Sequence, residues 1–141
     1  MKVTVPKEDV DDEFIEELIL RIKRNLIILF DGMKSKIDYL QRYVTKNIKR
    51  FSYSLDRIDL ESVITEGIDN IISKETTEEY IIQIDDKKFI NGVYVSVYDI
   101  CKFVNYGNFD VPGTMLFSNI FDETQKNLKR IEDIYYSGGT N

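Results

Sequence analysis

A long apolar series with helical spacing constrains the fold of this chain more than any other feature. Its members follow one another at steps of three or four residues, which is the period of an α-helix with one apolar stripe. They are Ile15, Ile19, Ile22, Leu26, Leu29, Met33, Ile37, Leu40, Val44 and Ile48. Asp11 or Asp12 supplies an N-cap, so the pattern predicts a helix over residues 12–49. Such a helix would be about 55 Å long, with Gly32 as the position for a bend or break.

Three large aliphatic residues, Leu20, Ile27 and Ile28, lie off the apolar stripe of this helix. Two interpretations are open: they contact a neighbouring subunit, or they pack under loops of the same chain. Basic residues lie broadly opposite the stripe, namely Arg21, Arg24, Lys36, Arg42, Lys46 and Arg50. The candidate subunit interface therefore comprises Leu20, Ile27, Ile28, Arg21, Arg24, Arg42 and Lys46.

The charge of the chain is segregated along the sequence. Residues 1–20 carry a net charge of −5, residues 21–50 carry +7 and residues 51–141 carry −8. A basic helix face can neutralise the phosphates of a nucleic acid, but the acidic remainder opposes approach to DNA. Docking of the basic face against an acidic face of another copy is the favoured hypothesis, and a merely solvated face is the alternative.

Residues beyond the long helix predict short strands followed by one more helix. Residues 50–60 form a connection, and residues 60–73 fit either a short helix or a helix running into a strand. The remaining expected elements are strands at 79–85 and 93–98, an ambiguous segment at 100–106, a loop around Pro112-Gly113, and a final helix from Ser118 or Asn119 to Tyr135. This order predicts an α+β fold with a small antiparallel sheet.

We expect one domain over residues 1–136, with residues 1–11 and 137–141 flexible. The longest apolar block, residues 26–30, is far too short to span a membrane, and the polar, acidic N-terminus does not fit a signal peptide. The sequence thus predicts a protein of the cytoplasm in which it is made.

The residue types offer no support for catalysis, a metal or a cofactor. The chain has no histidine and a single cysteine, which excludes histidine-based triads and cysteine metal clusters. Cys101 stands among apolar neighbours and is interpreted as a small buried hydrophobic residue. The carboxylate pair Asp85-Asp86 is interpreted as part of a polar turn, because it lacks the spacing of a calcium loop. We therefore predict that the protein is not an enzyme.

The second half resembles the tail-completion, or head–tail joining, proteins of tailed bacteriophages. That family has an apolar-Glu-aromatic-Gly turn, a proline-containing loop, an aromatic-apolar pair and a last helix. The matching residues here are Tyr98, Cys101, Val104, Asn105, Tyr106, Gly107, Asn108, Pro112, Leu116 and Phe117, with Asp59-Leu60 and Val63-Ile64 upstream. Asn105 stands where Glu is usual, the Thr-Gly before Leu60 is missing, and the loop lacks a second proline.

The resemblance implies a structural role in the virion. Copies of such proteins assemble into a ring, typically of six, at the head-proximal end of the tail tube, where they meet neck proteins. The resemblance thus implies assembly in the host cytoplasm, contacts with tail-tube and connector proteins, and a basic channel lining that touches passing DNA without reading it. The alternative is a small cytoplasmic interaction or regulatory protein that binds an acidic partner through its basic helix.

Overall fold

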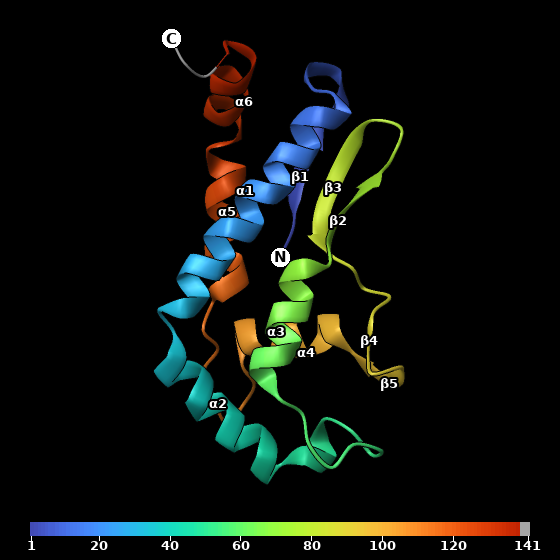
Figure 1. The fold of residues 1–141 in the computed structure, drawn as a ribbon, viewed down its shortest axis with the longest axis vertical. Coiled ribbons are helices and arrows are strands. Elements are labelled where there is room, and N and C mark those ends of the chain that lie inside the picture. Colours follow the sequence, from blue (N-terminus) through green and yellow to red (C-terminus); the bar gives the residue numbers. More distant parts are fainter. Residues whose placement is uncertain (139–141) are drawn as a thin grey trace.

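The computed structural model describes residues 1–138 and places helices around a small antiparallel sheet (Figure 1). The helices are α1 (Asp12–Asp31), α2 (Lys34–Lys46), α3 (Leu60–Asp69), α4 (Val97–Tyr106), α5 (Leu116–Lys126) and α6 (Leu128–Tyr136). The strands are β1 (Val3–Pro6), β2 (Ile71–Glu75), β3 (Glu79–Ile84), β4 (Phe89–Ile90) and β5 (Val93–Ser96), and two short 3-10 turns are η1 (Lys7–Asp9) and η2 (Ile48–Arg50). The predicted α+β class is confirmed.

The long helix predicted over residues 12–49 is two helices. The Asp11 carboxylate accepts a hydrogen bond from the Phe14 amide and caps α1, and α1 ends at Asp31 before Gly32. The apolar stripe nevertheless continues across the break, because Leu26, Met33 and Ile37 are all buried. The chain changes direction between α1 and α2 (Figure 1), so both helices turn the same stripe toward one core.

The N-terminal segment, expected to be flexible, is instead part of the sheet. β1 pairs antiparallel with β3, and β3 pairs antiparallel with β2, giving the order β1-β3-β2. Val3 and Val5 alternate toward the core, where they lie opposite Ile82 and Tyr80. The polar composition of residues 1–12 hid this two-residue alternation, and burial of both valines holds the segment in place.

Several helix and strand boundaries predicted for the second half of the chain differ from those in the structure. The strand expected at 93–98 ends at Ser96, whose side chain accepts a hydrogen bond from the Asp99 amide and caps α4. The final helix begins at Leu116 rather than at Ser118 or Asn119, and it is divided into α5 and α6 at Asn127. Neither Ser118 nor Asn119 caps the helix, since both lie within α5, where Ser118 is buried. Residues 139–141 of the expected flexible tail lie outside the described residues.

Candidate subunit interface

Three aliphatic side chains of α1 point away from the core into solvent. Leu20 is 53% exposed, Ile27 47% and Ile28 66%, although large aliphatic side chains are usually buried. Arg24 lies within one helical turn of all three and is also exposed. We call Leu20, Arg24, Ile27 and Ile28 the α1 face. In this monomer, no loop of the described chain covers it, so the interpretation of packing under the chain's own loops is not supported.

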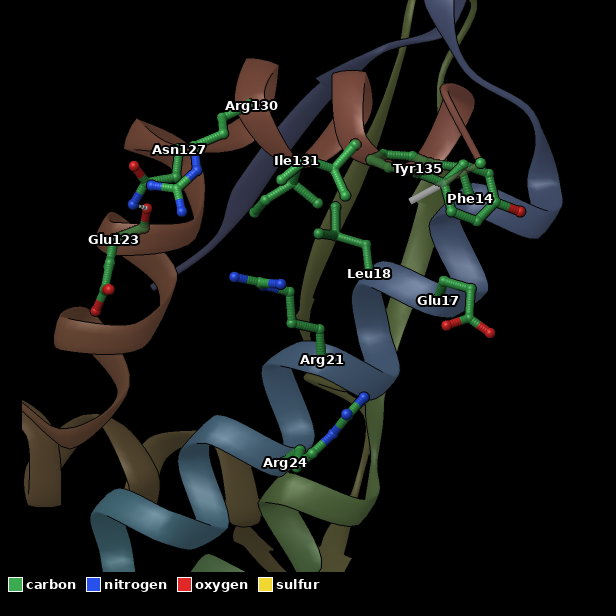
Figure 2. Close-up of a pocket in the computed structure, with 12 residues that line it drawn as sticks. Phe14, Glu17, Leu18, Arg21, Arg24, Glu123, Asn127, Arg130, Ile131 and Tyr135 are labelled. Atoms are coloured by element: carbon green, nitrogen blue, oxygen red, sulfur yellow. Dashed lines mark hydrogen bonds between the residues drawn. The ribbon is translucent and has the colours of Figure 1, made fainter. Parts of the chain in front are cut away.

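A cleft of about 570 Å³ lies between α1 and the α5–α6 pair, next to the α1 face. Ile131 and Tyr135 of α6 line its apolar side, above the buried Phe14 and Leu18 of α1 (Figure 2), and the exposed Ile134 also lines it. Phe14 packs edge-on against Tyr135, with ring centroids 5.3 Å apart. A volume of this size accepts a large side chain or a short segment of a partner.

Arginines surround this cleft without partners. Arg21, Arg24 and Arg130 line it, and within residues 1–138 their guanidinium groups make no hydrogen bond or ion pair. Figure 2 shows the Arg21 side chain extending from α1 toward α5. Glu17 and Glu123 also line the cleft, so the balance of charge is slightly positive. The cleft therefore combines an apolar floor with donors that remain free for carboxylates or aromatic faces.

The structure brings together only part of the predicted interface. Leu20, Arg21, Arg24, Ile27 and Ile28 share the exposed side of α1. Arg42 and Lys46 are also exposed, but they lie on α2. This helix follows the break and runs in a different direction from α1 (Figure 1). They form a separate basic surface, because the break at Gly32 divides the single face that a straight helix would have had.

Among the cleft residues of α5 and α6, Asn127, Arg130 and Ile134 were not singled out from the sequence. Asn127 and Arg130 stand in a polar stretch that gave no signal. Ile134 gave a weak signal, because it is a large apolar residue next to Tyr135 on the expected final helix. It is 49% exposed at the edge of the cleft.

The residues that carry the family resemblance form the joint between α4 and α5. Asn105 is fully buried, and its Oδ1 accepts hydrogen bonds from the amides of Phe117 at 3.0 Å and Ser118 at 2.9 Å. Its Nδ2 donates to the Ser118 hydroxyl at 2.7 Å. Asn105 thus caps the first turn of α5 from the end of another helix, a task that an acidic side chain at this position could also perform.

The other motif residues fix the loop that follows this cap. Gly107 has a φ of +71° and forms an isolated bridge with Pro112. Val104 is buried and its carbonyl accepts hydrogen bonds from both the backbone amide and the hydroxyl of Thr114. Phe117 is fully buried, whereas Tyr106 is 53% exposed. The motif is therefore a structural joint that leaves one aromatic residue on the surface.

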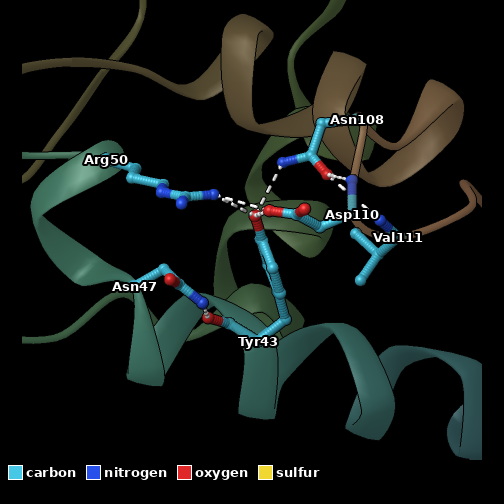
Figure 3. A network of polar contacts seen from close by, with 6 residues as sticks. All are labelled: Tyr43, Asn47, Arg50, Asn108, Asp110 and Val111. Carbon is cyan, nitrogen blue, oxygen red and sulfur yellow. Dashed lines mark hydrogen bonds and ion pairs between the residues drawn. The ribbon is translucent and has the colours of Figure 1, made fainter.

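A polar network holds the tip of this loop against α2 and η2 (Figure 3). The Tyr43 hydroxyl donates to Asp110 at 2.8 Å and accepts from Asn108 at 3.0 Å. Arg50 donates to the same Asp110 oxygen at 2.6 Å and to the Tyr43 hydroxyl at 2.9 Å. The hydrogen bonds from Tyr43 and Arg50 hold the pKa of Asp110 below its usual range.

Neither this network nor the exposed Phe109 within its loop was predicted from the sequence. Phe109, between Asn108 and Asp110, is 109% exposed, which is as much as a side chain in an open peptide. The available signal was a phenylalanine between two turn-forming polar residues, where an apolar side chain has no local use. Tyr43 was hidden because it adjoins the apolar stripe of the predicted helix.

Three other features considered from the sequence are the single cysteine, a metal site and a membrane span. Cys101 is buried as predicted, its thiol faces the Val63 carbonyl at 3.9 Å, and burial raises its pKa to about 12. Within residues 1–138, no group of three or more His, Cys, Asp or Glu side chains is placed to hold a metal ion. In the same residues, no helix has both the length and the apolar character that crossing a membrane requires.

No protein-family model, curated protein or solved structure matches this chain.

Proposed function

We propose that this chain is a structural protein of a tailed-bacteriophage virion, which forms a ring at the head-proximal end of the tail and connects it to the neck. Copies meet through protein–protein contacts, and the chain performs no catalysis. The ring, of about six copies by the resemblance, ends the tail tube and presents a docking surface to connector proteins. The resemblance of the second half of the chain to tail-completion proteins supports the phage role, and the exposed surface of α1 supports the contact between copies.

The observation that carries the proposal is the exposure of Leu20, Ile27 and Ile28 on one helix. Three large aliphatic side chains on a single solvent-facing surface are unfavourable for an isolated monomer and typical of an interface core. The neighbouring cleft adds a concave surface with unpaired arginines, which are enriched at protein interfaces. A ring requires two different surfaces on each copy, so the α1 face and the cleft would represent one of them.

The proposal is tested by electron microscopy of the purified protein, alone and mixed with tail tubes of the phage that carries the gene. We expect rings, or added density at one end of the tube. Ile28→Asp should abolish both, because it places a charge in the core of the contact. Tyr39→Asp is the matched control, since Tyr39 is 50% exposed on α2, outside the α1 face.

Absence of tube binding by the wild-type chain would reject the phage role, whether or not rings form. The alternative, an interaction protein that binds an acidic partner through its basic helix, would then be tested with Arg21→Glu and Arg24→Glu. Rings that persist in Ile28→Asp would leave the phage role standing but would remove α1 from the interface.

A further inference from the structure

Phe109 is both exposed to solvent and held in a fixed position. It lies at the tip of the loop between Gly107 and Pro112, and Tyr106 and Met115, on either side of this loop, are 53% and 43% exposed. Three large apolar side chains within residues 106–115 are therefore exposed to solvent. Such a group marks a contact site when it is held in place.

The backbone on both sides of Phe109 is fixed. The Asn108 amide donates to the Val111 carbonyl at 2.9 Å, and Asn108 Oδ1 accepts from the amides of Asp110 and Val111. The Asn108 and Asp110 side chains are both bound to the Tyr43 hydroxyl (Figure 3). Because the loop is ordered before any partner arrives, docking of Phe109 loses little conformational entropy.

We infer that Phe109 is an anchor that inserts into the α1–α6 cleft of a second copy of this chain. This inference rests on the proposed function, because it names the surface that meets the cleft when copies assemble. The two surfaces are different parts of the molecule, so the contact is heterologous, as a closed ring requires. A buried aromatic anchor in a pocket is also the usual centre of a protein interface.

The chemistry of the cleft fits this occupant. Its accessible apolar surface comes from Ile131, Ile134 and Tyr135, against which an inserted ring can pack, while Phe14 beneath them is buried by Tyr135 and Tyr136. Arg21 and Arg130 can lie over the inserted ring. Asp110 accepts all its hydrogen bonds through Oδ2 within the described chain, which leaves Oδ1 for a cleft arginine of the second copy.

Cross-linking between two marked chains tests the contact without removing the anchor. Tyr106→Cys marks the loop of one chain and Ile134→Cys marks the cleft edge of another, and a short bifunctional maleimide joins thiols that lie close together. The native Cys101 does not interfere, because it is buried. We expect a cross-linked dimer from the mixture of the two chains and none from either chain alone, on the purified protein and on protein bound to tail tubes.

Adding Phe109→Ala to the Tyr106→Cys chain should reduce the cross-linked dimer by about tenfold or more, because loss of an aromatic anchor has effects of this size. Tyr53→Ala in the same chain is the control, since Tyr53 is 93% exposed on a different loop. The inference is overturned if the mixture gives no dimer, if Tyr106→Cys alone gives as much, or if Phe109→Ala leaves the yield unchanged.

These results separate the inference from the proposed function. Wild-type rings without the Tyr106–Ile134 cross-link would reject the anchor and leave the ring proposal standing. A cross-link that depends on Phe109, in a protein that does not bind tail tubes, would support the contact between copies and reject the head–tail joining role.

Discussion

At the residue scale, Asn105 shows how a buried polar side chain can determine the junction of two helices. It is fully buried, yet its amide group is bound at both ends, to two backbone amides and one hydroxyl of α5. Buried polar groups destabilise a fold unless they are paired, so the partners of Asn105 depend on it as much as it depends on them. The side chain therefore specifies where α5 starts, although α5 contributes no cap of its own.

Asn105→Ala should lower the free energy of unfolding by about 2–3 kcal/mol, because it leaves the amides of Phe117 and Ser118 buried without an acceptor. Asn105→Asp should cost less, since a carboxylate still accepts both hydrogen bonds near a helix N-terminus. Urea titration of the two variants measures the difference, with the exposed Asn119→Ala as control. Equal losses for Ala and Asp would contradict the capping role.

Cys101 gives a prediction about pH at the same scale. Burial raises its pKa to about 12, so the native state favours the neutral thiol. This stabilisation is complete below the pKa of an unfolded cysteine, about 8.5, and is lost as pH rises toward the folded value. A thiol reagent at pH 8 should therefore modify Cys101 only in denaturant. Rapid modification of the native protein would show that the site opens readily.

At the scale of elements, the sequence predicted the parts that one rule determines and missed those that depend on tertiary partners. Helical spacing located α1 and α2, and β-branched residues located β3. The break after α1 was anticipated only as a position, because its angle depends on how Met33 and Ile37 reach the core. β1 was missed because the strand is stabilised by pairing with β3, which is far away in the sequence.

The candidate site divides in the same way. The positions of Leu20, Ile27 and Ile28 off the apolar stripe were predicted because one helix period is enough to place them, whereas their exposure was left open. The cleft was not predicted, because its walls come from α1 and α6, and no local pattern says which helices will be neighbours. Phe109 was missed because its display depends on the hydroxyl of Tyr43, which is distant in sequence but adjacent in space.

Two glycines give opposite predictions for the same substitution. Gly107 has a φ of +71° with ψ of −159°, a conformation almost confined to glycine, and an added methyl group would overlap the Val111 backbone. Gly107→Ala should cost roughly 3 kcal/mol of stability. Gly32 has an ordinary helical φ of −84°, and an added methyl group would meet the Leu29 carbonyl oxygen at an ordinary contact distance of 3.5 Å, so Gly32→Ala should be neutral or stabilising by up to about 1 kcal/mol.

Thermal unfolding of both variants checks this pair. A loss of stability in Gly32→Ala comparable to that in Gly107→Ala would mean that the break between α1 and α2 requires glycine. The expected result would instead assign the break to the packing of the apolar stripe, with glycine merely permitting it.

At the scale of the whole molecule, the displayed loop and the cleft determine what kind of assembly is possible. A contact between two different surfaces produces a closed ring if the rotation between copies closes, and an open filament if it does not. The hydrogen bonds of Asp110 to Tyr43 and Arg50 fix the loop that carries Phe109 relative to the cleft of the same chain. This favours one fixed rotation between neighbouring copies. The proposed role requires closure, since a filament would not end a tail tube.

Sedimentation velocity over a wide range of protein concentration distinguishes these assemblies. A closed ring predicts two species, the monomer and one oligomer, whose proportions change while their sedimentation coefficients stay constant. Ile28→Asp and Phe109→Ala should shift the proportion toward monomer, and Tyr53→Ala should not, because Tyr53 lies outside both proposed contact surfaces. Mass that grows continuously with concentration would identify an open chain, and the ring would then have to be abandoned even if both surfaces prove to be in contact.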